Sequence, residues 1–451
     1  MSVLDEIVKA YDIRGTVPDQ LHGEVAHALG VAYARFVDAD RVLVARDMRQ
    51  SGEMLASEFA RGIMEQGLDV VDLGLGSTDL LYYAAGSLDA PGAIFTASHN
   101  PAQYNGVKLC LSGARPVGID SGLAEVRDVA ATVLDGNGPR MAESAGSLSS
   151  LDVLPAFVDH VLSFVDVDAM APMRVVADTA NGMGGLVVPA VFDRLPMIDL
   201  EVMYGELDGT FPNHPADPLQ PANQRDLQGR VASGGFDVGL AFDGDADRVF
   251  VVDELGVGMS GSTTTALLAA AVLRSAPGAT ILHNLICSRA VPETITEHGG
   301  VPIRTKVGHS FIKQEMAATG AVFGGEHSAH YYFADNYRAD SGLIASLLVL
   351  DEISRCGQPL SVLRQPFERY AASGEINTQV DHPAAILEHV SEAFGSRRQD
   401  RLDGLSIDGE SWWFNLRPSN TEPLLRLNLE ASDRDECDSR VAEILALITS
   451  A

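Results

Sequence analysis

Three aspartates alternate in the segment Asp243-Gly-Asp-Ala-Asp-Arg248, directly after an apolar run at residues 236–242. That run and the apolar residues 249–252 are predicted to form buried strands. The carboxylates therefore lie on a tight turn at a strand end, where their mutual repulsion needs a positive charge to offset it. A hard divalent cation with oxygen ligands, Mg²⁺ in particular, suits such a group.

Two other interpretations compete with a magnesium site. The aspartates, together with Glu254, fall at positions 1, 3, 5 and 12 of an EF-hand loop. However, Arg248 occupies position 6, where that loop needs glycine for its sharp turn. The strand-like flanks also disagree with an EF-hand, which has a helix on each side. A plain acidic surface turn remains open.

Ser98 lies on a second predicted turn, in the segment Thr96-Ala-Ser-His-Asn-Pro101 that follows an apolar strand. Pro101 prevents simple continuation of the strand, so the serine and the neighbouring His99 are exposed on a loop. A loop serine often serves only as a turn or cap residue. No G-x-S-x-G elbow surrounds it, which argues against an acyl-transfer triad. What remains is a hydroxyl that could carry a phosphoryl group, whose developing charge a nearby Mg²⁺ would neutralise.

The elements that position these loops repeat along the chain as three predicted α/β units. In each unit an apolar strand enters a polar loop, at residues 93–100, 238–245 and 321–328. Such sheets present their functional loops at the carboxyl ends of the strands. The last part of the chain has predicted strands at 369–380, 404–408, 412–416 and 424–430. This pattern indicates a smaller α+β domain.

We therefore expect three similar α/β domains with mixed sheets, followed by a smaller α+β C-terminal domain. Small and polar residues at 135–150 suggest a linker. The expected domains span residues 1–148, 149–253, 254–367 and 368–451. Each length is within the usual range for a domain.

The composition of the 451 residues restricts the partners and the compartment. A net charge of −30 argues against nucleic acid, whose phosphates need a basic surface. No apolar stretch approaches the ~18 residues that span a bilayer, and the N-terminus lacks a signal pattern. Four widely separated cysteines suggest neither a disulfide framework nor a zinc site. We expect a cytoplasmic protein without membrane contact, whose scarce lysines, including Lys108 and Lys306, form local positive sites.

Four motifs occur in order at domain-sized separations: TASHNP at 96–101, DGDADR at 243–248, GEHSAH at 325–330 and RPSNTEP at 417–423. Together with YDIRG at 11–15, NGVK at 105–108 and KVGHS at 306–310, they closely resemble the α-D-phosphohexomutases. The resemblance is to the bacterial phosphomannomutase/phosphoglucomutase branch and covers essentially the whole chain. It implies a heart-shaped arrangement of the four domains around a central cleft.

The resemblance implies that Ser98 is a phosphoserine that donates and recovers the phosphoryl group. One Mg²⁺ per chain would bind to Asp243, Asp245 and Asp247, with the Ser98 phosphate as a further ligand. Arg248 would lie beside the substrate or the phosphoserine. Such a site suits phosphoryl transfer, which depends on positioning and charge neutralisation.

Arg14, Lys108 and His309 match family positions that assist proton transfer and charge stabilisation. His309 is the best candidate for the general acid/base, because an unperturbed imidazole titrates near neutrality. It could also be a structural loop histidine. Lys108 could act electrostatically even if it moves no proton, and the identity of the acid/base stays open.

Glu326, Ser328 and His330 alternate along a segment that is predicted to be extended, so their side chains would project to one face. That arrangement suits binding of adjacent sugar hydroxyls, although a polar strip at a sheet edge has the same pattern. The family usually has glycine where Ala329 stands, which puts the geometry of this loop in question.

Arg417 begins a segment that combines one cation with hydroxyls, an amide and backbone donors, which is typical of a phosphate cradle. A turn capped by proline would look similar. The resemblance assigns Arg417, Ser419, Asn420 and Thr421 to the phosphate of the substrate that does not react.

The implied activity interconverts hexose 6-phosphate and hexose 1-phosphate, with mannose and also glucose as the sugar. One serine cannot reach both O1 and O6 of a fixed hexose. The economical mechanism therefore passes through a hexose 1,6-bisphosphate, also the activator, which turns end over end. A phosphoglucosamine mutase, a hexose-1,6-bisphosphate synthase and a catalytically silent binding homologue are the alternatives, although His327 and Asn420 disfavour the first. The preferred sugar, the pathway, the resting phosphorylation of Ser98 and the choice between monomer and homodimer stay open.

Overall fold

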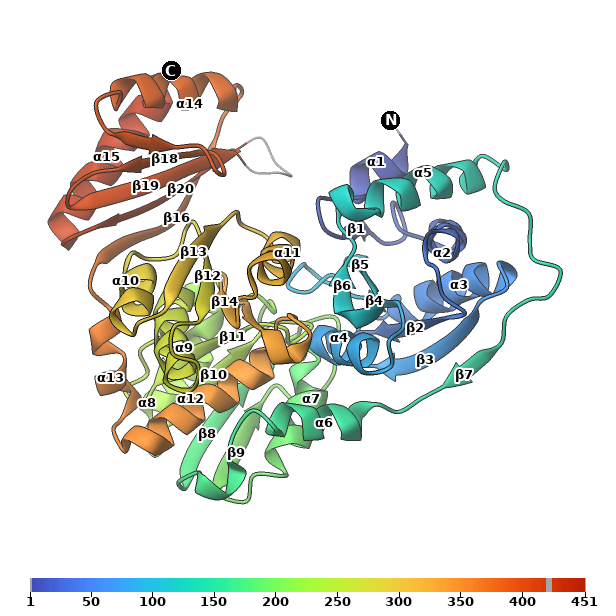
Figure 1. Ribbon diagram of the computed structural model, residues 1–451, viewed down its shortest axis with the longest axis horizontal. Helices are drawn as coiled ribbons and strands as arrows, with labels where there is room; N and C mark the ends of the chain where they lie inside the picture. Colours follow the sequence, from blue (N-terminus) through green and yellow to red (C-terminus); the bar gives the residue numbers. More distant parts are fainter. Residues whose placement is uncertain (1, 419–423, 451) are drawn as a thin grey trace. The chain divides into compact units, whose positions relative to one another are not determined.

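The computed structural model describes residues 2–418 and 424–450, except for the side chain of His309. Within this range the chain divides into two compact units, residues 1–260 with 328–363, and residues 261–327 with 364–451. Figure 1 shows the helices and strands of both units, and each unit is described by itself.

The first sheet of the first unit is mixed and has the strand order β1-β5-β4-β2-β3-β7, with β6 beside β5. β2 pairs in parallel with β3 and β4, whereas β5 runs antiparallel to β1 and β4. The elements in chain order are α1 (Val3–Ile7), β1 (Ile13–Thr16), α2 (Gly23–Phe36), β2 (Arg41–Arg46), α3 (Gly52–Glu65), β3 (Asp69–Leu75), α4 (Thr78–Ser87), β4 (Gly92–Phe95), β5 (Tyr104–Leu111), β6 (Arg115–Pro116), α5 (Leu123–Leu134) and β7 (Leu148–Ser150).

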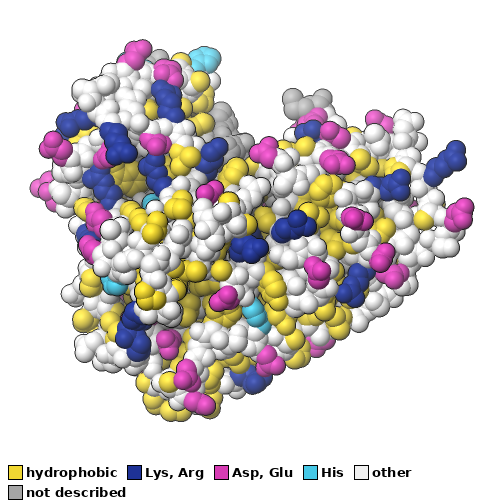
Figure 2. Space-filling model, in the orientation of Figure 1, with side chains coloured by type: hydrophobic (Ala, Val, Ile, Leu, Met, Phe, Trp, Pro, Cys, Tyr) yellow, Lys and Arg dark blue, Asp and Glu magenta, His cyan; other side chains and the backbone are white. Residues whose placement is uncertain are grey.

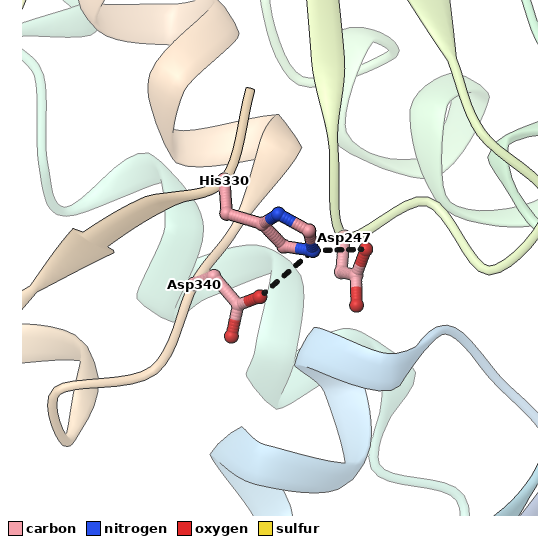
Figure 3. Close-up of side chains that lie close together, drawn as sticks. All are labelled: Asp247, His330 and Asp340. Atoms are coloured by element: carbon pink, nitrogen blue, oxygen red, sulfur yellow. Dashed lines mark ion pairs between the residues drawn. The ribbon is translucent and has the colours of Figure 1, made fainter. Parts of the chain in front are cut away.

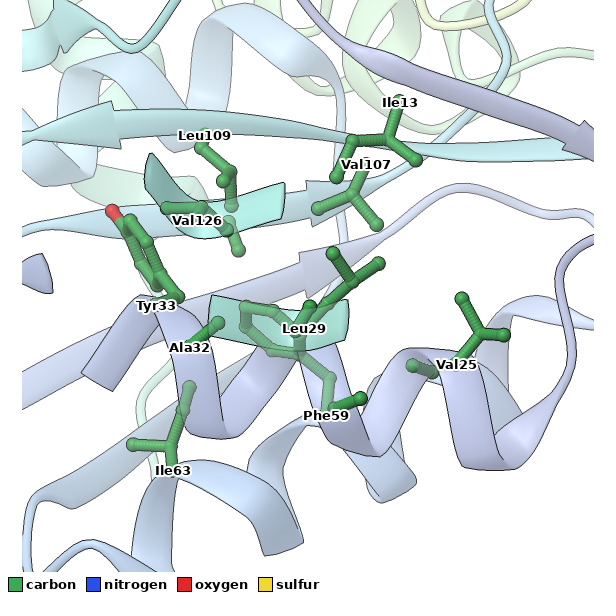
Figure 4. Packing of buried hydrophobic residues seen from close by; sticks show 14 of the residues in the cluster. Ile13, Val25, Leu29, Ala32, Tyr33, Phe59, Ile63, Val107, Leu109 and Val126 are labelled. Atoms are coloured by element: carbon green, nitrogen blue, oxygen red, sulfur yellow. The ribbon is translucent and has the colours of Figure 1, made fainter. Parts of the chain in front are cut away.

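Helices α2 and α3 pack closely against each other on one face of this sheet (Figure 4). A Cβ atom at Gly30 of α2 would lie 2.1 Å from the carbonyl oxygen of Phe59 in α3, so the backbones touch there. The rings of Tyr33 and Phe59 fill the space between these helices and the sheet, where they lie near Val107. This core holds the strands whose carboxyl ends carry the Ser98 loop.

The second sheet of this unit has the order β11-β10-β8-β9, in which only the edge strand β11 is antiparallel. Its elements are α6 (Leu154–Leu162), β8 (Met173–Asp178), α7 (Gly184–Phe192), β9 (Ile198–Met203), α8 (Arg225–Ala232), β10 (Val238–Phe242) and β11 (Val249–Asp253). The unit ends with β15 (Tyr331–Phe333), α12 (Gly342–Cys356) and α13 (Leu360–Leu363). The apolar helix α12 joins this unit because it packs on β11 and α6.

The second unit begins with three parallel strands, in which β12 lies between β13 and β14. Its first elements are α9 (Gly261–Ser275), β12 (Thr280–Asn284), α10 (Ala290–Glu297), β13 (Val301–Thr305), α11 (His309–Thr319) and β14 (Phe323–Gly325). An antiparallel sheet of order β16-β20-β19-β18-β17 follows. It consists of β16 (Ala371–Gln379), β17 (Arg398–Asp400), β18 (Leu405–Asp408), β19 (Trp412–Pro418) and β20 (Leu424–Ala431), with the helices α14 (Pro383–Ala393) and α15 (Arg434–Ser450).

These elements confirm the expected class, α/β sheets followed by a smaller antiparallel α+β domain. The expected linker at 135–150 is irregular over most of its length, but its last residues form the strand β7, which pairs with β3. The short strand β17 was not expected from the sequence. It is held by its pairing with β18 rather than by an apolar pattern of its own.

No helix within the described ranges is both long enough and apolar enough to cross a membrane. The acidic side chains on the visible face are scattered among basic ones rather than gathered in one patch (Figure 2).

Candidate active site

The three aspartates lie on the turn that joins β10 to β11, and all three are buried. Because the strands on both sides pair antiparallel, the turn closes a β-hairpin and an EF-hand is excluded. One oxygen from each of Asp243, Asp245 and Asp247 lies within 4.8 Å of the others. The structure thus brings together the carboxylates that the sequence predicted as a group.

Two of these oxygens suit a cation that binds through oxygen atoms. Oδ1 of Asp245 and Oδ1 of Asp247 are buried and have no hydrogen-bond partner within the described part of the chain. Burial of an ionised oxygen without a partner is costly. Because Mg²⁺ prefers carboxylate oxygens, the three aspartates fit this ion.

Lys108 of β5 supplies one positive charge to this group. Its Nζ lies 2.7 Å from Oδ2 of Asp245 and 2.7 Å from Oδ2 of Asp247. Burial alone would lower the pKa of Lys108, but the two carboxylates outweigh it, so the pKa lies well above its ordinary value. Lys108 is therefore charged at neutral pH and cannot readily give up a proton in this state. This supports an electrostatic part for the side chain.

Thr78, the first residue of α4, also holds Asp245. Its hydroxyl donates to Oδ2 of Asp245 at 2.6 Å, and its amide donates to the Asp245 carbonyl at 3.1 Å. The helix thereby fixes both the backbone and the side chain of the central aspartate.

Ser98 lies in the loop after β4, and its Oγ donates a hydrogen bond of 2.7 Å to Oδ2 of Asp243. The serine is buried, so the expectation that it is exposed on its loop is wrong, because the aspartate turn and Arg248 cover it. Its φ of 48° is the left-handed conformation that few residues other than glycine adopt. Its amide donates to Oγ1 of Thr96 at 2.9 Å. The structure therefore places the serine hydroxyl directly against the aspartate turn.

Arg248 lies beside Asp243 and pairs with its carboxylate. Its Nε and Nη2 lie 2.9 and 2.8 Å from Oδ2 of Asp243, and Nη2 donates to Nδ1 of His99 at 2.7 Å and to the Ser98 hydroxyl at 3.4 Å. Burial, together with Arg248 and Arg14, holds the pKa of His99 well below its ordinary value. His99 is therefore neutral near pH 7 and accepts from Arg248 through Nδ1.

The balance of charge in this group favours a further cation. Lys108 and Arg248 face three carboxylates, so one negative charge is left over when all three are ionised. Burial raises the pKa of Asp243 well above its ordinary value, against the opposing effect of Arg248. A bound divalent cation would lower that pKa again.

Arg14 of β1 reaches the same loop from another side. Its Nε pairs with Oδ2 of Asp12 at 2.8 Å, and its Nη1 donates to Oδ1 of Asn100 at 2.5 Å. The guanidinium is partly exposed, so it can meet a ligand from solvent.

His330 belongs to a second group of possible metal ligands, with Asp247 and Asp340 (Figure 3). Its Nε2 lies 3.7 Å from Oδ1 of Asp247 and 3.8 Å from Oδ2 of Asp340. Its Nδ1 lies 3.0 Å from the hydroxyl of Ser328. Ser328 and His330 therefore lie beside the aspartate turn in the first unit.

The prediction that residues 326–330 form an extended segment is wrong, because residues 327–329 form a turn. Ala329 has a φ of 65°, a backbone conformation that glycine adopts most readily. This explains why the family that the sequence resembles usually has glycine at this position. The alternation of side chains along this segment therefore gives no information about which face they share.

The remaining predicted residues lie in the second unit. Oε1 of the buried Glu326 accepts hydrogen bonds of 3.1 Å from Nδ2 of Asn284 and from the amide of Gly308. Arg417 pairs with Glu375 at 3.1 Å, and its buried Nε has no hydrogen-bond partner among the residues described. Ser419, Asn420 and Thr421 lie outside the described residues, and so does the side chain of His309, the first residue of α11.

Comparison with known proteins identifies the family. Models described as phosphoglucomutase/phosphomannomutase alpha/beta/alpha domains I, II and III and C-terminal domain match residues 5–131, 155–256, 260–370 and 375–447. A phosphomannomutase of Salmonella montevideo is 39% identical over 452 residues, which cover 98% of each chain. The chain belongs to the phosphoglucomutase/phosphomannomutase family. It therefore has the four-domain architecture of that family and is a mutase, an enzyme of the isomerase class.

Two further members of the phosphoglucomutase/phosphomannomutase family are similar over nearly the whole length. The phosphohexose mutases of Xanthomonas campestris pv. campestris are 39% identical over 446 residues, 98% of each chain. A crystal structure of a family protein from Burkholderia thailandensis is 29% identical, with a TM-score of 0.88 over 100% of this chain and 98% of that one.

Several residues of this family site were not singled out from the sequence. Thr78 and Asp47 lie just beyond strand ends, a position that the rule for parallel sheets marks as functional. Arg49 also follows the end of β2, but its contacts, like those of Asp340, are with distant parts of the chain and could not be predicted from its position.

Proposed function

We propose that this enzyme interconverts hexose 6-phosphate and hexose 1-phosphate, with mannose and also glucose as the sugar, through phospho-Ser98 and a hexose 1,6-bisphosphate. The observation that carries the proposal is the 2.7 Å hydrogen bond from Ser98 Oγ to Asp243, beside buried oxygens of Asp245 and Asp247 that accept no hydrogen bond from the residues described. A hydroxyl in that place becomes a phosphoryl carrier if one Mg²⁺ binds to the three aspartates.

The proposed transfer breaks the bond between phosphorus and the Ser98 oxygen and forms a bond between phosphorus and a sugar oxygen. The sugar hydroxyl loses its proton to a base, and Ser98 Oγ regains one when it leaves. The reverse transfer, from the other phosphate of the bisphosphate, restores phospho-Ser98. Both steps need an in-line arrangement and neutralised charge more than covalent help from the protein.

The charges around Ser98 suit such a transfer. Arg248 donates to Ser98 Oγ, and Lys108 keeps Asp245 and Asp247 in place. Mg²⁺, when bound by Ser98 phosphate and the three aspartates, would neutralise charge on the phosphoryl oxygens. Arg14, partly exposed beside the loop, is placed to meet the transferring group. His309 remains our candidate for the acid/base, because an unperturbed imidazole titrates near neutrality.

Recognition of the sugar and of its second phosphate is proposed for residues from the later domains. Glu326, Ser328 and His330 would bind the sugar hydroxyls. Arg417 would bind the phosphate that does not react, together with Ser419, Asn420 and Thr421. The buried Nε of Arg417 has no hydrogen-bond partner among the described residues. This supports the assignment, because a guanidinium N–H that lacks a partner suits an anion.

The test is the variant Ser98→Ala, assayed with mannose 1-phosphate, a trace of hexose 1,6-bisphosphate and Mg²⁺. We expect loss of most turnover, and we expect the intact mass of the wild type, but not of the variant, to increase by one phosphoryl group. Ser87→Ala is the matched control, because Ser87 is an exposed serine at the end of α4, and it should keep wild-type turnover.

Wild-type rates in Ser98→Ala would remove the phosphoserine from the mechanism. Comparison of mannose 1-phosphate, glucose 1-phosphate and glucosamine 1-phosphate as substrates separates the proposed activity from a phosphoglucosamine mutase. Release of the bisphosphate as the main product would instead indicate a synthase, and absence of turnover on all three sugars would indicate a silent homologue.

A further inference from the structure

Arg49 lies beneath the Ser98 loop, in the segment between β2 and α3, and only 1% of its side chain is exposed. Its Nη2 donates to the carbonyl oxygens of Ser98 at 2.8 Å and Asn100 at 2.7 Å. Its Nη1 donates to the carbonyl oxygens of Pro101 and Tyr104, both at 2.9 Å. One guanidinium thus binds four carbonyls of the loop that carries the proposed phosphoserine.

The Ser98 loop needs such support for two reasons. Ser98 is held in the left-handed conformation, which costs on the order of 1–3 kcal/mol in a residue other than glycine. The carbonyl groups of Ser98, Asn100 and Pro101 lie outside the strands, so hydrogen bonds of the sheet do not satisfy them. A buried carbonyl without a partner is costly, and Arg49 supplies a partner to the carbonyls of Ser98 and Asn100, whereas that of Pro101 also accepts from the Tyr104 amide at 3.0 Å.

The guanidinium is itself held on two further sides. Nε pairs with Oδ2 of the buried Asp47 at 3.2 Å, and the Arg49 amide donates to Oδ1 of the same carboxylate at 2.9 Å. The ring of Phe211, from the loop after β9, lies 5.1 Å from the guanidinium carbon. A planar group with five donors in fixed directions is thereby locked in one orientation.

We propose that Arg49 is a positioning residue for the phosphoryl transfer, because it sets the backbone direction from which Ser98 Oγ meets Asp243. The inference rests on the proposed function, since it assumes that Ser98 carries the phosphoryl group. In the contacts described for it, Arg49 touches neither the Ser98 hydroxyl nor the three aspartates of the turn at 243–247. It acts through the carbonyl groups of Ser98 and Asn100.

The test compares Arg49→Met and Arg49→Lys with the wild type in kcat, in KM and in the rate at which hexose 1,6-bisphosphate phosphorylates Ser98. A misplacement of about 1 Å costs on the order of 100-fold in rate, so we expect kcat and the phosphorylation rate of Arg49→Met to fall by about 100-fold. KM should change little, because the residues proposed to bind the sugar and its second phosphate are unaltered.

Arg49→Lys keeps the positive charge beside Asp47, so it should fold even where Arg49→Met does not. Its three donors radiate from one nitrogen and cannot serve four carbonyls in a plane. We therefore expect no more than partial rescue, with kcat still at least about 10-fold below the wild type. Arg61→Met is the matched control, because Arg61 lies on the exposed face of α3 and its loss should leave all three quantities unchanged.

Wild-type kcat and phosphorylation rate in Arg49→Lys would overturn the proposal. Failure of both Arg49 variants to fold would also overturn it, because Arg49 would then serve the whole domain rather than the loop. If the wild type is never phosphorylated on Ser98, the proposed function fails first, and the mass of the wild type shows this independently of either variant.

Discussion

Replacement of Lys108 by methionine tests whether the aspartate turn is short of positive charge. The lysine is 8% exposed and pairs with two carboxylates at 2.7 Å, so its loss leaves both carboxylates buried and unpaired on that side. Removal of one partner from a buried ion pair costs about 3–5 kcal/mol. In EDTA we expect the free energy of unfolding of Lys108→Met to be lower than that of the wild type by about this amount.

Magnesium should reduce the difference in the free energy of unfolding between Lys108→Met and the wild type. The variant has one negative charge more in the cluster, so it should bind the ion more tightly than the wild type does. Each tenfold gain in affinity adds about 1.4 kcal/mol of stabilisation at saturating ion. We therefore expect the gap between the two proteins to shrink by at least about 1 kcal/mol in saturating MgCl₂.

Urea denaturation of both proteins in EDTA and in MgCl₂ measures these quantities. Lys306→Met is the matched control, because this lysine is exposed and its side chain contacts only the face of Phe311 in the interactions described. It should unfold like the wild type under both conditions. A loss below about 1 kcal/mol in EDTA for Lys108→Met, or an equal magnesium increment in variant and wild type, would refute the reasoning.

Two further predictions concern a buried acid and the phosphate cradle. Burial raises the pKa of Asp79 to about 7, against hydrogen bonds from Ser77 and Ser341, so the folded state binds a proton that the unfolded state has lost. Stability should therefore fall between about pH 4 and pH 7 by a few kcal/mol, and Asp79→Asn should remove this part of the fall when urea denaturation is compared at pH 5 and pH 8. An equal fall in the variant would contradict it. Arg417→Ala should raise KM for hexose phosphate by about tenfold or more with a smaller change in kcat, and steady-state kinetics with an unchanged KM would argue against the cradle.

The parts of the site that follow a strand could be predicted from the sequence. Asp243 and Ser98 both come directly after a buried apolar strand, and the carboxyl ends of such strands meet at one edge of a sheet. The types of these residues then indicated cation binding and a phosphoryl carrier. The structure adds that the two loops hydrogen-bond to each other, although they belong to different sheets.

Contacts that depend on packing between distant segments could not be predicted. Lys108 lies within β5, where strand periodicity shows only that it faces one side of the sheet. The turn at 327–329 was missed because alanine gives no sign of the left-handed conformation that Ala329 adopts. Residues 328–363 join the first compact unit because α12 buries its apolar side on β11, which a division of the sequence into consecutive domains does not foresee.

The hydrogen bonds between Thr78 and Asp245 have a consequence for folding. They join residues that are 167 positions apart, and the closure of so long a loop has to be offset by contacts that form with it. The aspartate turn therefore reaches its final geometry only after both sheets of the first unit exist, late in the folding of the chain. During synthesis, a nascent chain that ends before β11 contains every strand of the first sheet but lacks one strand of the second sheet, and so has no complete site. In hydrogen exchange, the Thr78 amide should report the docking of the two sheets rather than the local opening of α4.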